Sequence, residues 1–268
     1  MVFRVADAKV LEKEFKVKVL DIKIAERTFL VLLLVASLAI RLIDLGAHSL
    51  WFDELYSAIY AHESIFGDKF WEITSGDVHP PGYGILVSLF FVLFGESEFS
   101  LRLPSALAGG LTCLITYQFC KKNLNTHIAL FSSVLVCLCP FLINYSQEAR
   151  ANSTLVLMYM LSLLGLFGIL KTEKKNILLL AATSLSLSVM AYLHYSGLVY
   201  ASILMAFFLI YTLLSVKNKF ADFMIVAVVF TFLYLPWVPE FIKHITIGGL
   251  GWLDKPNFND LYTLVYIG

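Results

Sequence analysis

The sequence predicts an all-α polytopic membrane protein. Of its 268 residues, 59% are hydrophobic and 15% are charged, and the mean hydropathy is +0.79. Soluble domains carry about 25% charged residues. The apolar residues also gather in runs that approach the roughly 20 residues needed to cross a bilayer. These two observations exclude a disordered chain, a nucleic-acid-binding arm and a typical cytosolic enzyme.

Eight apolar runs divide the chain. Seven are near the length of a membrane span, whereas the run at 82–95 has only 14 residues, which is short for a full crossing. The runs lie at 28–45, 82–95, 102–120, 126–143, 154–170, 176–194, 196–215 and 221–239.

The placement of charge decides whether the short run crosses. If it does not, 14 of the 20 Lys and Arg residues share one side and 13 of the 20 acidic residues share the other. Membrane proteins keep an excess of Lys and Arg in their cytoplasmic loops. We therefore expect seven spans with a cytoplasmic N-terminus, and an interfacial or membrane-dipping helix at 82–95.

This topology divides the chain into five parts. The first 27 residues contain no apolar run of signal-peptide length, and we interpret them as a cytoplasmic leader. The four cysteines all lie in or beside apolar runs, which indicates buried thiols rather than a disulfide framework. After the leader we expect a first transmembrane span at 28–45, an outer loop with juxtamembrane helices at 46–101, six further spans within 102–241, and the start of a second outer loop at 242–268.

Polar residues at the membrane boundary are the candidate site, because ionisable groups there are costly and often functional. All of them fall on the predicted outer side. They are Asp53 and Glu54 after the first span, Asp77 and His79 before Pro80-Pro81, Arg102 at the start of the next span, Gln147, Glu148 and Arg150 in the segment SQEAR, and, as a weaker signal, His194 and Tyr195.

Each of these residues also has a structural interpretation. Asp53 and Glu54 suit the first turn of a helix, where the dipole favours acids. Asp77 suits a cap before a helix that starts at the prolines. Arginines at this depth extend to lipid headgroups, and Arg150 is close enough in sequence to pair with Glu148. The residue patterns alone leave both interpretations open.

The ordered motifs resemble a known family. They are WFDE at 51–54, D-x-HPP at 77–81, G-x-S-E-F-S-x-R-L-P-S-A-L at 95–107 and P-x-x-x-x-x-SQEAR at 140–150. This set, over residues 28–240, resembles the membrane glycosyltransferases with the GT-C fold, in particular the glycosyltransferase 39 or protein-mannosyltransferase-like superfamily, which includes aminoarabinose transferases. The resemblance implies a GT-C-like transmembrane helix bundle and a polyprenyl-phosphate-linked sugar donor used at the outer face.

The resemblance also assigns roles within the site. It implies that Asp53, with Glu54 completing the motif, acts on the acceptor, that Asp77 helps to bind the acceptor or a metal, and that the segment at 147–150 lines the same cavity. The chemistry requires a carboxylate base for the acceptor hydroxyl and cations for the leaving phosphate, for which Arg102 and Arg150 are candidates. One carboxylate activating the acceptor predicts inversion at the anomeric carbon.

Several points stay open at this stage. A divalent metal ion is compatible with the sequence, with Asp77, His79 and Glu148 as candidate ligands, but the chemistry requires no certain cofactor. The expected partners are the lipid-linked donor of a hexose or pentose, an unidentified acceptor (protein, lipid or glycan) and the lipid bilayer, but no nucleic acid. The alternatives are a transporter or flippase-like carrier and a non-catalytic, truncated membrane subunit.

Overall fold

The computed structural model describes residues 24–246, and this part of the chain forms helices and turns without any strand. The leader up to residue 23 and the predicted outer loop from residue 247 lie outside the described residues. A first helix covers residues 24–42. It is followed by α2 (Phe52–His62), α3 (Asp68–Gly76), α4 (Gly82–Phe94), α5 (Glu98–Asn123), α6 (Thr126–Leu138), α7 (Pro140–Ser146), α8 (Asn152–Lys171), α9 (Ile177–Leu193), α10 (Tyr195–Leu214), η1 (Lys217–Lys219), α11 (Phe220–Tyr234), η2 (Leu235–Trp237) and α12 (Val238–Thr246).

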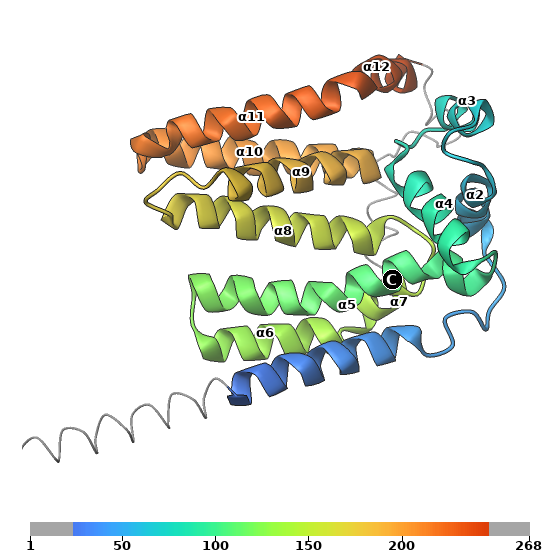
Figure 1. Ribbon diagram of the computed structural model, residues 1–268, viewed down its shortest axis with the longest axis horizontal. Helices are drawn as coiled ribbons and strands as arrows, with labels where there is room; N and C mark the ends of the chain where they lie inside the picture. Colours follow the sequence, from blue (N-terminus) through green and yellow to red (C-terminus); the bar gives the residue numbers. More distant parts are fainter. Residues whose placement is uncertain (1–23, 247–268) are drawn as a thin grey trace, which may run out of the picture.

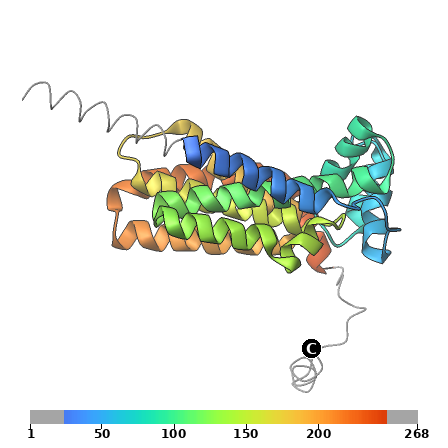
Figure 2. The same cartoon turned by 90° about the horizontal axis from the view of Figure 1, so that it is seen from below.

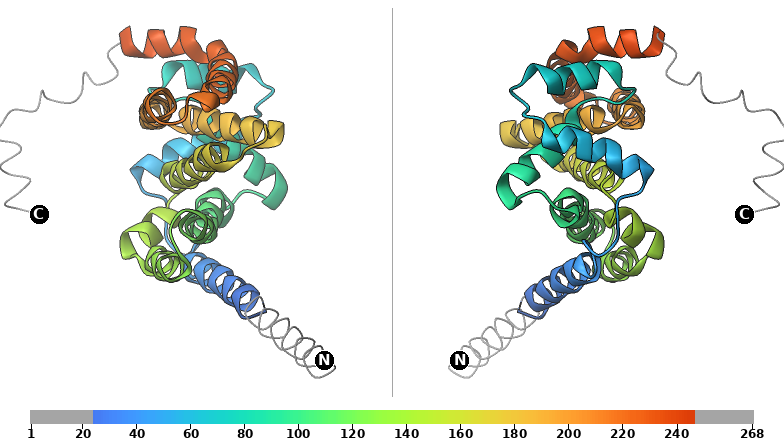
Figure 3. Two further views of the ribbon diagram at one scale, coloured as in Figure 1. Left: turned by 90° about the vertical axis from the view of Figure 1, so that its left-hand side faces the viewer. Right: turned by 90° about the vertical axis from the view of Figure 1, so that its right-hand side faces the viewer.

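The long helices lie side by side and form an elongated bundle (Figures 1 and 2). Helix α5 packs against α6 and α8, and α9 packs against α8, α10 and α11. Seen along the helices, the chain proceeds from residues 24–42 at one edge to α11 and α12 at the other (Figure 3). The α5–α6, α8–α9 and α10–α11 connections lie at one end, and α2, α3 and α4 cover the opposite end (Figure 1).

The helices confirm a multi-pass, all-α membrane fold. Four segments within the described residues are long and apolar enough to cross: α5, α8, α10 and the continuous segment Lys217–Thr246. The pair α6 and α7, bent by 56°, makes a fifth. Helix α9 has only 17 residues, and it lies parallel to its neighbours (Figure 1). The length and composition of the helices within residues 24–246 thus support four to five spans, where the sequence predicts seven for the chain.

Local signals set the helix boundaries at both ends of the bundle. Asn125 and Asn176 cap α6 and α9, each accepting a hydrogen bond from a backbone N–H of the first turn. Pro140 opens α7 at its first position and separates it from α6. Helix α4 starts after the double proline and ends at Gly95, whose φ of 82° suits glycine. Both ends of α4 therefore stay at the end of the bundle that carries α2 and α3 (Figure 1).

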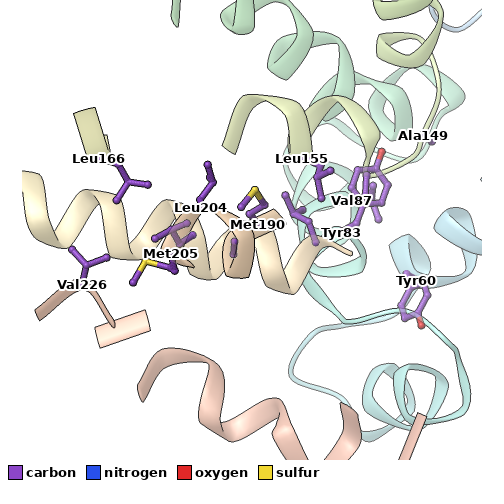
Figure 4. Packing of buried hydrophobic residues seen from close by; sticks show 14 of the residues in the cluster. Tyr60, Tyr83, Val87, Ala149, Leu155, Leu166, Met190, Leu204, Met205 and Val226 are labelled. Carbon is purple, nitrogen blue, oxygen red and sulfur yellow. The ribbon is translucent and has the colours of Figure 1, made fainter. Parts of the chain in front are cut away.

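A continuous apolar core joins the bundle to this end. Its buried side chains extend from Val226 and Leu166 past Met190 to Tyr83 and Tyr60 (Figure 4). At Gly82 a Cβ atom would collide with the backbone carbonyl of Tyr192 at the end of α9, so the glycine permits the close approach of α4. This packing fixes the segment that carries Asp77. All four cysteines carry free thiols, and Cys113, Cys120 and Cys137 are buried whereas Cys139, predicted to be buried, is only half-buried.

Candidate active site

Glu54 and Arg102 form a buried ion pair beneath the end of the bundle. Their side chains are 0% and 6% exposed. The Arg102 Nε atom lies 2.8 Å from Glu54 Oε1 and Nη2 lies 2.7 Å from Oε2. The backbone N–H of Ala149 donates to Oε1 at 2.7 Å, and that of Trp51 donates to Oε2 at 3.3 Å. Burial alone would raise the pKa of Glu54, but the hydrogen bonds from Arg102 and Ala149 hold it below its usual value.

Arg102 has no donor left for a substrate. Besides the two bonds to Glu54, its Nη1 donates to the carbonyls of Leu45 and His48 and its Nη2 to that of Ser49, at 3.0, 2.8 and 3.2 Å. A guanidinium has five N–H donors, and all five are used. The sequence suggests Arg102 as a cation for the donor phosphate, whereas the geometry makes it a clamp that holds the segment before α2 against α5.

Asp53 and Arg150 form a second, more open pair. The Arg150 Nη2 atom lies 3.5 Å from Asp53 Oδ2, and Nη1 donates to the Asp53 carbonyl at 3.3 Å. The Asp53 side chain is 38% exposed and that of Arg150 is 24% exposed. The Ser105 hydroxyl donates to the Arg150 carbonyl at 2.9 Å, which fixes the loop. Arg150 therefore pairs with Asp53, and the sequence alternative of a local pair with Glu148 is not what the fold adopts.

Glu148 and Gln147 precede Arg150 in the loop between α7 and α8 and have different surroundings. Glu148 is half-buried, and among residues 24–246 its carboxylate has no hydrogen bond or ion pair. Burial, reinforced by the negative charges of Glu54 and Asp53, raises its pKa. Gln147 instead anchors the loop, since its amide donates to the Ile43 carbonyl at 3.0 Å.

Asp77 is held by its neighbours just before α4. Its Oδ1 accepts a 2.6 Å bond from the N–H of Val78 and lies 3.3 Å from His79 Nδ1. The Tyr60 hydroxyl donates to its Oδ2 at 2.9 Å. Burial opposes ionisation, but the hydrogen bonds from His79, Val78 and Tyr60 keep the pKa of Asp77 below its usual value. Asp77 is therefore an ionised acceptor at neutral pH.

His194 and Tyr195 stand where α9 meets α10. His194 caps α10, and its Nδ1 accepts from the N–H of Ser196 at 3.1 Å. Its ring lies 5.3 Å from that of His79. Burial and the positive charges of His79 and Arg150 lower the pKa of His194 to about 4. His194 therefore lies beside His79 and next to the group around Asp77.

The structure thus brings the predicted residues to one end of the bundle but gives them unequal roles. Asp53, Glu148 and Arg150 present partly open functional groups, whereas Glu54, Arg102 and Gln147 hold the backbone. No group of three His, Cys, Asp or Glu residues within 24–246 is arranged to hold a metal ion. Asp77 and His79 offer two donors, fewer than the three protein ligands of a catalytic zinc site, and Glu148 does not join them. We therefore derive no chemical step through a metal.

Two residues near the site are not among the candidates that the sequence predicts. Arg41 is fully buried, and its guanidinium donates to the Ser146 hydroxyl and to the carbonyls of Val136 and Cys137 where α6 ends. Its position inside an apolar run is a usable signal. His244 contacts Tyr195, and a separation of 49 residues gives no local pattern that would reveal this contact.

A sequence model of the family described as dolichyl-phosphate-mannose-protein mannosyltransferase matches residues 78–238. The chain belongs to this family. The matched range begins four residues before α4, ends at the first residue of α12 and includes Arg102, Glu148, Arg150 and His194. Asp53, Glu54 and Asp77 precede it.

Individual relatives agree with the family assignment. The Bacillus subtilis protein named "Putative mannosyltransferase YycA" is 25% identical over 158 residues, which is 59% of this chain and 23% of that protein. The crystal structure of ArnT from Cupriavidus metallidurans bound to undecaprenyl phosphate is similar with a TM-score of 0.62 and 17% identity, over 83% of this chain and 43% of ArnT.

A second solved structure shows the same fold. The Saccharomyces cerevisiae protein O-mannosyltransferase complex Pmt1–Pmt2 bound to the sugar donor gives a TM-score of 0.60 and 18% identity, over 83% of this chain and 33% of that chain. These likenesses confirm the predicted GT-C fold. The chain spans less than half the length of each of these relatives.

Proposed function

We propose that this protein transfers a hexose or pentose from a polyprenyl-phosphate donor to an acceptor hydroxyl at the outer face of the membrane, with inversion at the anomeric carbon. The observation that supports it best is the pair of Asp53 and Arg150. A partly exposed carboxylate and a partly exposed guanidinium lie side by side at the end of an apolar bundle. A lipid tail can lie along such a bundle while an acceptor approaches from water.

Asp53 is the general base of this mechanism. It takes the proton from the acceptor hydroxyl as the acceptor oxygen attacks the anomeric carbon. The bond between that carbon and the phosphate oxygen breaks, and the lipid phosphate leaves with the electron pair. A single displacement of this kind inverts the anomeric centre. Glu54 and Arg102 act as positioning residues, since their buried pair fixes the start of α2 and hence the Asp53 backbone.

Arg150 stabilises the leaving phosphate. It is the site arginine with a partly exposed side chain, and its ion pair with Asp53 at 3.5 Å is long enough to exchange for a phosphate contact. The undecaprenyl phosphate of the ArnT structure and the sugar donor of the Pmt1–Pmt2 structure support a lipid-linked donor by analogy.

The test is transfer of a radiolabelled sugar from a polyprenyl-phosphate donor in membranes that contain the full chain. We expect Asp53→Asn to reduce kcat at least a hundredfold while the melting temperature is retained, because the variant loses the base but keeps the side-chain size. The matched control is Asp68→Asn, which makes the same change at an exposed acid in the first turn of α3. Near-normal turnover by Asp53→Asn would contradict the assignment of the base. Absence of transfer by the wild-type protein with every donor tried would favour the carrier or non-catalytic alternative.

A further inference from the structure

One face of α5 supports the loop between α7 and α8. Ser105 and Gly109 are four residues apart on α5, so they lie on the same side of the helix. The Ser105 hydroxyl donates to the Arg150 carbonyl at 2.9 Å. A Cβ atom at Gly109 would collide with the Ser146 side chain, which precedes the loop. The glycine therefore permits the close approach of this segment to α5, and the serine holds the loop there.

Helix α2 binds the same loop at Ala149. The Ala149 N–H donates to Glu54 Oε1 at 2.7 Å, and the Ala149 carbonyl accepts from the Ser57 hydroxyl at 2.6 Å. Glu54 and Ser57 are one turn apart on α2, and both are buried. With the bond from Ser105, three backbone groups of Ala149 and Arg150 have buried partners. The backbone that carries the Arg150 side chain is thus held by α2 and α5 together.

A second hydroxyl supports Ser105. The Tyr83 hydroxyl on α4 lies 3.0 Å from Ser105 Oγ. The single proton of Ser105 goes to the Arg150 carbonyl, which can only accept, so Tyr83 is the donor in the other contact. Ser105 and Tyr83 are 0% and 7% exposed, so bulk water does not compete for these bonds. A directional chain of two hydroxyls therefore joins α4 to the Arg150 backbone.

The glycines on either side of Tyr83 hold α4 in place. A Cβ atom at Gly82 would collide with the Tyr192 backbone at the end of α9. One at Gly84 would collide with the Tyr60 ring on α2. Next to Tyr83, helix α4 is therefore in close contact with both α9 and α2. This packing sets the point from which the chain of hydroxyls begins.

We propose that Ser105 and Tyr83 are positioning residues for Arg150, which hold its side chain where it can act beside Asp53. The inference deepens the proposed function and rests on it, because Arg150 is the residue that stabilises the leaving phosphate there. Helix α2 carries Asp53 and also binds the loop at Ala149, so one hydrogen-bond network sets the base and the arginine relative to each other. Ser105 and Tyr83 act only through Arg150.

A double-mutant cycle on sugar transfer by the full chain in membranes tests this role. We expect Ser105→Ala to lower kcat/KM for the lipid-linked donor about tenfold or more, since small displacements of a catalytic group are costly. Ser105→Cys, whose thiol is a weak donor, should lie between Ser105→Ala and wild type. In an Arg150→Ala background, Ser105→Ala should cause no further loss, because the residue that it positions is absent. Where Arg150→Ala abolishes turnover, the same cycle is measured on the affinity for undecaprenyl phosphate.

Amide hydrogen exchange measures the position of the loop without any need for activity. Ser105→Ala should speed exchange in peptides that cover residues 147–152, and Tyr83→Phe should do so to a smaller extent. Ser133→Ala is the matched control for both experiments. Ser133 is also a fully buried serine, but it lies in α6 and donates to the Leu130 carbonyl of its own helix.

Two results would overturn the positioning role. One is unchanged exchange of residues 147–152 in Ser105→Ala protein. The other is an equal loss from Ser105→Ala in the wild-type and Arg150→Ala backgrounds, which would indicate a general structural effect. Failure of the proposed function looks different: if the wild-type protein transfers no sugar while Ser105→Ala still speeds exchange in the loop, the reaction is wrong and the positioning of Arg150 by Ser105 stands.

Discussion

The adjacent acidic residues Asp53 and Glu54 have different surroundings at the start of α2. Successive side chains of a helix point about 100° apart, so Asp53 faces the open end of the bundle while Glu54 enters the protein. Their surroundings then decide the chemistry. Glu54 receives four hydrogen bonds and is fully buried. The Asp53 carboxylate has one long ion pair and is 38% exposed.

The Glu54–Arg102 pair should behave as a buried ion pair. We expect Arg102→Met to lower the free energy of unfolding by about 3–5 kcal/mol, because it leaves a buried carboxylate without its counterion. The double variant Glu54→Met with Arg102→Met should be more stable than either single variant. Thermal unfolding in detergent measures this, with Lys69→Met as the control because Lys69 belongs to an exposed ion pair. A double variant no more stable than the single ones would contradict this assignment.

Glu148 should make stability depend on pH. Its pKa is raised in the folded protein, so the protonated form is favoured, and its contribution to stability is fully present below the usual carboxyl pKa and is lost as pH rises through the raised value. Glu148→Gln mimics the protonated form. We expect this variant to melt at a higher temperature than wild type at pH 7 and at the same temperature at pH 3.5. Glu173→Gln, at an exposed loop position, should show neither effect, and a lower melting temperature of Glu148→Gln at pH 7 would disprove the sign.

At the scale of elements, the break between α6 and α7 brings the loop of Glu148 to the site. Pro140 lacks a backbone N–H and terminates α6, which frees carbonyls near its end. Arg41, from the helix at 24–42, donates to the carbonyls of Val136 and Cys137 at 3.3 Å each. The positive side chain also suits the negative end of a helix. Arg41 therefore caps the broken span.

Loss of this cap should destabilise the bundle. We expect Arg41→Met to lower the free energy of unfolding by about 1–3 kcal/mol, since it leaves buried carbonyls without donors. Arg27→Met is the matched control, because Arg27 lies exposed on the same helix. Thermal unfolding again measures the change. Equal melting temperatures of the two variants would show that Arg41 is not a structural cap.

At the scale of the whole molecule, the connections separate into two ends with different charges. The last turn of α5 carries Lys121 and Lys122, and η1 carries Lys217 and Lys219, at the end opposite α2, α3 and α4 (Figure 1). From the positive-inside rule we propose that this basic end faces the cytoplasm. The same assignment places the Asp53 end outside, as the proposed function requires.

Accessibility labelling tests this orientation. In a chain whose four cysteines are replaced by serine, we expect Lys174→Cys and Lys217→Cys to react with a membrane-impermeant maleimide only after the membrane is opened. Asp68→Cys and Glu148→Cys should react in intact cells. Unaltered transfer activity of each variant at positions 68, 174 and 217 serves as the folding control. Reaction of positions 174 and 148 from the same side would contradict the orientation.

The sequence by itself determined the membrane class, the GT-C resemblance and the short helix at 82–95. These properties depend on apolar run length and on proline and glycine positions, which are local along the chain. Helix α4 begins at Gly82 and stops at Phe94, before Gly95, because the double proline and the glycine act within a few residues. The apolar run lengths and the distribution of charge likewise placed the acidic and basic candidate site residues on one side of the membrane.

Only the tertiary structure decided which of those candidates remain available for chemistry. Arg102 and Arg150 look alike in sequence. Arg102 nevertheless uses all five of its N–H donors in hydrogen bonds to the protein, whereas Arg150 does not. The hydrogen bond from Ser105 to the Arg150 carbonyl joins residues that are 45 positions apart. Burial and hydrogen-bond partners come from helix packing between distant segments, so no pattern along the chain encodes them directly.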